Sequence, residues 1–95
     1  MPDPIDVRCE PSAAGSGWTC VVTIGGPGAL TTHEVTVTTA DLERLAPGAV
    51  SPEDLVRRSI AFLLAREPKE SILGRFDLAV IGRYFPGYER QIRQG

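Results

Sequence analysis

The stretch S-P-E-D-L-V-R-R-S-I-A-F-L-L, residues 51–64, decides the fold because it predicts the one long helix of this 95-residue chain. Serine is favoured at the N-cap, proline at the first helical position, and acidic residues in the first turn, where they complement the helix dipole. Pro68 disfavours the helical conformation at Glu67, so we expect the helix to end there after about four turns. The residues that repeat at helical spacing and face the core are Leu55, Val56, Ser59, Ile60, Leu63 and Leu64.

Three strands are predicted in the first 38 residues, and they form the surface that the helix covers. Apolar and polar residues alternate over residues 5–10, 18–24 and 33–38, and the β-branched residues that strands favour are frequent there. Because short glycine-containing loops separate the three runs, we expect an antiparallel meander. One face of this sheet is apolar and takes the helix, whereas the threonines and charged residues of the other face are expected to be solvated.

Shorter helices are expected on both sides of the long one. Thr39 is a candidate N-cap for a helical turn that stops at Pro47 and Gly48. Three further short helical segments are predicted at residues 69–73, 77–84 and 86–94. The predicted fold is therefore one α+β domain over residues 1–95. Its three-stranded meander occupies residues 1–38, and its helical half, with a C-terminal cap of short helices, occupies residues 39–95.

Composition and charge narrow the class of protein. With 42% hydrophobic and 23% charged residues, the chain has the composition of an ordinary globular domain. The N-terminal M-P-D-P-I-D is acidic and contains proline, unlike a signal peptide, which predicts a cytoplasmic protein. Six acids and two bases give residues 1–50 a charge of -4, and eight bases and six acids give residues 51–95 a charge of +2. An excess of two basic residues is far below the usual electrostatic footprint of a nucleic-acid binder.

Two cysteines face each other in the predicted first hairpin. If the hairpin pairs symmetrically about its loop, Cys9 lies opposite Cys20, close enough for a disulfide. The alternative is two buried thiols that pack as small hydrophobic groups, and a cytoplasmic location favours this state. We therefore expect both thiols to be reduced.

The sequence contains no recognisable catalytic constellation. The single histidine, His33, lies on the third strand, where Thr32 and Glu34 point to the opposite face, and we interpret it as a strand-end residue at the rim of the sheet. One histidine and two cysteines do not make a zinc site. The glycines of residues 25–28 match no phosphate-binding or dinucleotide-binding spacing. The protein is therefore not expected to be an enzyme, to bind a metal or to need a cofactor.

Aromatic and basic residues near the C-terminus form the candidate binding surface. The side chains of Tyr84, Phe85 and Tyr88 are able to stack on a single-stranded nucleic acid, with arginines on its phosphates. The interpretation that we favour is that a terminal helix packs these aromatic rings on the core while its arginines are solvated. The candidate partner-binding residues are Arg75, Arg83, Tyr84, Phe85 and Tyr88.

Residues 51–88 contain the run S-I-L-G-R-F-D-L-A-V-I-G-R-Y-F-P and resemble a group of small bacterial proteins of unknown function. This resemblance covers about two fifths of the chain and implies no activity, cofactor or catalytic residue. The order of three strands followed by a helix is also similar to the sheet-and-helix antitoxins of HicB type. The chain departs from that pattern because short helices stand where a further strand is expected, and because it has no obvious DNA-binding appendage.

The expected function is that of a non-enzymatic binding or adaptor protein, which contacts an unidentified protein or a second copy of itself. The alternative is a nucleic-acid-linked regulator, such as an antitoxin-like partner. Its phosphate contacts would come from Arg75, Arg83, Arg90 and Arg93. The acids interspersed among these arginines are Glu67, Glu70, Asp77 and Glu89. Because these carboxylates repel phosphates, a nucleic acid is not the expected partner. A membrane is not expected either, because no run of the sequence approaches the length of a membrane span.

Overall fold

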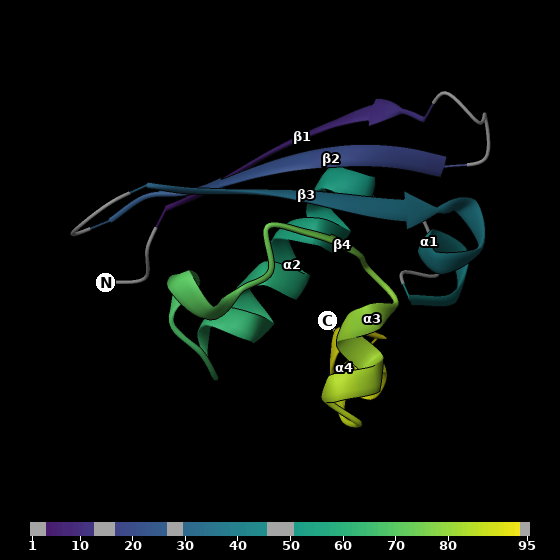
Figure 1. The fold of residues 1–95 in the computed structure, drawn as a ribbon. Helices are drawn as coiled ribbons and strands as arrows, with labels where there is room; N and C mark the ends of the chain where they lie inside the picture. The colour runs from purple at the N-terminus through teal and green to yellow at the C-terminus, as the bar shows by residue number, and fades with distance from the viewer. Residues whose placement is uncertain (1–3, 13–16, 27–29, 46–50, 94–95) are drawn as a thin grey trace.

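In the part of the chain that the structure describes, the fold is a four-stranded sheet backed by a layer of helices (Figure 1). The computed structural model describes residues 4–12, 17–26, 30–45 and 51–93. The strands are β1 (Ile5–Pro11), β2 (Gly17–Ile24), β3 (Thr31–Thr38) and β4 (Arg75–Asp77), in the order β1-β2-β3-β4. The first three are antiparallel, whereas β4 runs parallel to β3. The α+β class is confirmed.

All helices lie on one face of the sheet, beneath it in Figure 1. They are α1 (Thr39–Leu45), α2 (Pro52–Leu64), the 3₁₀ turn η1 (Lys69–Ser71), α3 (Val80–Tyr84) and α4 (Tyr88–Arg93). One long helix and a C-terminal group of short ones were expected, and both are present. The predicted stop of the first short helix, at Pro47 and Gly48, lies outside the described residues.

The first hairpin, formed by β1 and β2, has the predicted symmetric register. Cys9 lies opposite Cys20, and the Ser12 N–H donates to the Gly17 carbonyl over 2.9 Å at the loop end. Gly17 has a φ of +150°, and a Cβ there would collide with the Val37 carbonyl, so only glycine fits at the start of β2.

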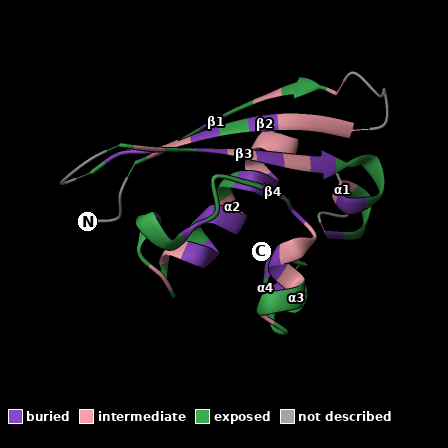
Figure 2. Ribbon diagram, viewed as in Figure 1, coloured by how far each residue is buried: buried purple, intermediate pink, exposed green. Residues whose placement is uncertain are grey.

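Burial alternates along the central strands as the sequence pattern predicts (Figure 2). The side chains that face the helices and are buried are Val7, Cys20, Val22, Ile24, His33, Val35 and Val37. The opposite face is open to solvent and carries a ladder of threonines around Val21, whose side chain is 44% exposed. The sheet therefore needs only the one helical layer.

The long helix begins as its sequence predicts and buries most of the predicted stripe. The Asp54 N–H donates to Ser51 Oγ over 3.2 Å, with proline at the first helical position. Leu64, which was assigned to the stripe, is only half-buried, while Phe62, which was not, is buried. Phe62 packs edge-on against Phe85 and Tyr88, with ring centroids 5.8 and 5.2 Å away, so α2 also covers the C-terminal helices.

The expectation of only three strands is wrong, because residues 75–77 add β4. The Glu34 N–H donates to the Gly74 carbonyl over 2.8 Å, and the Leu78 N–H donates to the Thr36 carbonyl over 2.9 Å. Phe76 is buried between two exposed neighbours, which is the alternation of a half-buried strand. A run of three residues is too short for its periodicity to be recognised in the sequence.

The predicted cap of the first short helix is wrong by one residue. Thr38 Oγ1, not Thr39, accepts from the Asp41 N–H over 3.0 Å. Asp41 Oδ2 accepts in return from the Thr38 N–H over 3.3 Å. This reciprocal pair satisfies two backbone donors where the chain turns from β3 into α1.

The expectation of reduced thiols is also wrong, because Cys9 and Cys20 form a disulfide, and the described residues contain no free cysteine. Cys20 is fully buried and Cys9 is half-buried. The bridge therefore ties the edge strand β1 to β2 on the face that the helices cover.

His33 is buried on β3 rather than placed at the rim of the sheet. Its Nδ1 lies 2.8 Å from the Leu73 carbonyl oxygen, and its Nε2 lies 3.0 Å from Thr31 Oγ1. Because a carbonyl oxygen only accepts, Nδ1 is the donor. His33 thus fastens the segment that leads into β4 to the neighbouring strand, which is a structural role.

Candidate functional site

An apolar groove lies between the C-terminal end of α2, the segment around η1, strand β4 and helix α3. Its volume is about 380 Å³, within the range of sites that bind ligands or side chains of partners. Leu63, Phe76 and Ile81 line it and are buried, so they form its floor. Leu73 and Tyr84 also line it but are 55% and 71% exposed, so they form its rim.

Two prolines and a buried lysine lie next to the residues that line this groove. Pro68 follows α2 and precedes η1, and Pro86 follows α3, so each wall ends at a residue that cannot continue a helix. The Lys69 side chain is buried and donates from Nζ to the Gly25 carbonyl over 3.0 Å. This bond holds the η1 wall against the end of β2.

The structure brings two of the predicted partner-binding residues into the groove and places the others elsewhere. Tyr84 and Phe85 line it, and Phe85 is half-buried. Arg83 is exposed on α3. Arg75 forms an ion pair with Glu34, with 2.8 Å between Nε and Oε2, on the open face of the sheet. Tyr88 is fully buried, which places it in the core and not on a binding surface.

Several groove residues were missed by the sequence reasoning. Ile72, Leu73 and Phe76 precede or enter β4, so their positions depend on a strand that was not predicted. The available signal was the pair of apolar residues directly before Gly74, in a segment too short to bury both.

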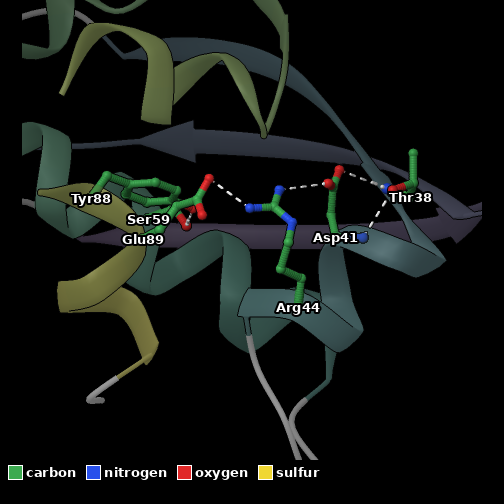
Figure 3. Close-up of polar contacts among 6 residues, drawn as sticks. All are labelled: Thr38, Asp41, Arg44, Ser59, Tyr88 and Glu89. Atoms are coloured by element: carbon green, nitrogen blue, oxygen red, sulfur yellow. Dashed lines mark hydrogen bonds and ion pairs between the residues drawn. The ribbon is translucent and has the colours of Figure 1, made fainter. Parts of the chain in front are cut away.

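A polar cluster joins the first short helix, α1, to the last one, α4 (Figure 3). The Arg44 guanidinium lies between two carboxylates, 3.2 Å from Asp41 Oδ1 and 2.6 Å from Glu89 Oε2. The hydrogen bond with Glu89 is the main reason that the pKa of Arg44 is raised above its ordinary value. Because all three side chains are paired and Asp41 also caps α1, this cluster holds α1 against α4.

A second part of the cluster lies inside the core. Ser59 Oγ donates to the Leu55 carbonyl over 2.8 Å and lies 2.6 Å from the Tyr88 hydroxyl. Because the serine proton is used on the carbonyl, the Tyr88 hydroxyl donates to Ser59 Oγ. Burial raises the pKa of Tyr88 to about 12. Both hydroxyls are out of reach of solvent and fully paired, so they stabilise the fold.

The buried Tyr88 hydroxyl should make stability fall steeply at high pH. Between pH 10 and about 12, Tyr88 ionises in the unfolded chain but not in the folded chain. Ionisation therefore stabilises the unfolded state, and the free energy of unfolding falls as pH rises. By pH 12 the loss from this one group should reach about 2 kcal/mol. The measurement is urea unfolding across this pH range for the wild type and Tyr88→Phe. Other groups titrate equally in both proteins, so equal pH slopes would contradict a raised pKa.

The described part of the chain contains no group of three or more histidine, cysteine, aspartate or glutamate side chains that could hold a metal ion. Within the same residues, no helix is long and apolar enough to cross a membrane.

No family model, curated protein or solved structure matches this chain. The resemblances to small bacterial proteins and to HicB-type antitoxins therefore stay predictions.

Proposed function

We propose that this protein is a non-enzymatic binding or adaptor protein whose groove receives an apolar segment of a partner protein. The observation that carries the proposal is the exposure of Leu73 and Tyr84, at 55% and 71%, on the rim of an apolar groove of about 380 Å³. Large apolar side chains that gather in one exposed place commonly mark an interaction site. Tyrosine is also among the residues that contribute most when a protein interface buries them.

The lining also indicates the chemistry of the partner. Among the described residues that line the groove, Glu67 is the only charged one. A segment with apolar side chains for the floor and one lysine or arginine beside Glu67 therefore complements the groove in both shape and charge. Burial of the rim would supply the apolar contact area that binding requires.

The arrangement of the arginines supports a protein partner over the nucleic-acid alternative. Arg75 is on the open face of the sheet and is already paired with Glu34. Arg83, Arg90 and Arg93 belong to α3 and α4, which lie on the other side of the sheet. A single phosphate backbone would have to reach both sides, so these residues do not make one basic surface.

The disulfide supports an oxidising compartment as the place where this function is carried out. Disulfides persist in secreted and other oxidising environments and are rare in a reducing cytoplasm. The Cys9–Cys20 bridge therefore argues against the cytoplasmic location expected from the N-terminal sequence.

The proposal is tested by comparing what three immobilised proteins retain from an extract of the native host. The proteins are the wild type, the groove variant Leu73→Ser/Tyr84→Ser, and Val21→Ser as a matched control for an exposed apolar residue on the opposite face. A partner of the groove should be retained by the wild type and the control but not by the groove variant. Titration calorimetry with the purified partner should then show affinity about tenfold weaker or worse for the groove variant. Equal affinity for all three proteins would refute the proposal.

The charge of the partner segment is tested with Glu67→Lys. This change should weaken the same binding, and more so at low salt, because it replaces attraction by repulsion. The matched control is Glu70→Lys, since Glu70 is exposed close by and does not line the groove. An equal effect of both substitutions would show that only general charge is involved.

A further inference from the structure

The outer edge of β1 is free of any strand in the described part of the chain, because β1 is the first strand of the sheet and pairs only with β2. The backbone bonds at the hairpin ends identify which residues point outward. Ser12 bonds to Gly17 and Pro4 bonds to Gly25, so the even-numbered residues of β1 direct their backbone groups toward β2. The N–H and C=O groups of Ile5, Val7 and Cys9 therefore point outward, where nothing in the described sheet pairs with them.

The charges along this edge alternate in sign. Asp6, Arg8 and Glu10 point to the open face of the sheet, and each of these side chains is exposed. The Asp6 and Arg8 side chains are 65% and 85% exposed and are 3.6 Å apart. An edge strand that carries this acid–base–acid order is complementary to an antiparallel copy of itself in particular registers.

We propose that two copies of this chain form a homodimer by antiparallel pairing of their β1 strands about a two-fold axis at Val7. In this register Ile5 of one copy exchanges backbone hydrogen bonds with Cys9 of the other, and the two Val7 residues bond to each other. All of these groups are the outward-pointing ones. Asp6 of each copy then lies opposite Arg8 of the other, in a non-hydrogen-bonded pair, where facing side chains are closest.

The neighbouring registers are less favourable. With the axis at Arg8, the two Arg8 side chains face each other and Asp6 faces Glu10, so every facing charged pair is repulsive. With the axis at Cys9, Arg8 faces Glu10, but Val7 then lies opposite Pro11, which has no N–H to donate. Shifts that pair odd-numbered with even-numbered residues fail because the even-numbered groups already point to β2.

The two-fold axis at Val7 runs through the sheet, so both helical layers stay on one side and both open faces stay on the other. The two sheets then join into one continuous sheet, and the exposed edge that invites uncontrolled pairing is removed. This dimer is independent of the proposed function, because the groove is built from β4 and the segments around it, at the other end of the strand order.

The test is analytical ultracentrifugation of the full-length protein over a range of concentrations. The wild type should sediment with twice the monomer mass of 10.2 kDa. Asp6→Arg and Arg8→Asp should each raise the dissociation constant about tenfold or more, because each places like charges opposite one another twice in the dimer. The double variant Asp6→Arg/Arg8→Asp restores opposite charges across the axis and should recover the wild-type dissociation constant.

Two further variants test the register of the dimer and its independence from the groove. Glu10→Lys should leave the dimer unchanged, whereas it would break a dimer centred on Cys9. The groove variant Leu73→Ser/Tyr84→Ser should also remain dimeric, which separates this inference from the proposed function. Because the side chains of Asp6 and Arg8 are exposed, their substitution should leave the fold of the monomer intact, which circular dichroism checks. A monomeric wild type, or a double variant as weak as the single ones, would overturn the inference.

Discussion

Replacing Leu63 with alanine is expected to lower the free energy of unfolding by about 2–5 kcal/mol. Leu63 is 5% exposed and belongs to the same core cluster as Ile60, Val22 and Val35. The substitution removes three carbons from a site between α2 and the sheet, and the surrounding side chains cannot fully close the cavity. Chemical denaturation of the two proteins at the same pH measures the difference.

The matched control is Leu73→Ala, because Leu73 is the same residue type on the same groove but is 55% exposed. Its effect on stability should stay within about 0.5 kcal/mol. A loss of less than about 0.5 kcal/mol for Leu63→Ala would mean that the α2 stripe does not face the core.

Removing the disulfide with Cys9→Ala/Cys20→Ala is expected to destabilise the protein by about 3 kcal/mol. The bridge joins residues separated by 11 positions, and it restricts the unfolded chain more than the folded one. Wild-type protein treated with a reductant should show a similar loss. The two unfolding curves are measured by urea denaturation, with the oxidised wild type as the reference.

The redox state itself is checked by titrating thiols in denatured, unreduced protein taken from its native host. No free thiol is expected, because both cysteines are in the bridge. Two free thiols in that sample would restore the original expectation of reduced cysteines and, with it, the cytoplasmic location.

Most features that depend on local sequence were predicted correctly, although the cap of α1 is Thr38 and not Thr39. Alternation over whole strands identified β1, β2 and β3, and the symmetric loop placed Cys9 opposite Cys20. Ser51 capped α2 as expected, since a cap depends on residues within one turn. The redox state of the cysteines was predicted wrongly because it was argued from the compartment and not from the geometry of the pair.

Features that depend on distant pairing were not predictable in the same way. The three residues of β4 are a strand only because β3 offers them a partner, and the buried His33 bonds to the Leu73 carbonyl, 40 residues away. In the candidate site, too, local features were predictable and distant contacts were not. Local aromatic density singled out Tyr84 and Phe85, which line the groove, but also Tyr88, which is buried and bonds to Ser59, 29 residues away.

The parallel pairing of β4 with β3 links binding in the proposed groove to the folding of the last third of the chain. Glu34 and Arg75 are neighbours in the sheet although the whole of α1 and α2 separates them in sequence, and β4 contributes three residues to this long-range pairing. Short pairing over a long loop places β4 at the low-stability end of the cooperative units of the fold. A segment bound in the groove contacts α2, β4 and α3 together, so it would suppress local opening there. The affinity of the proposed groove for such a segment would thus include the free energy of keeping its own walls assembled.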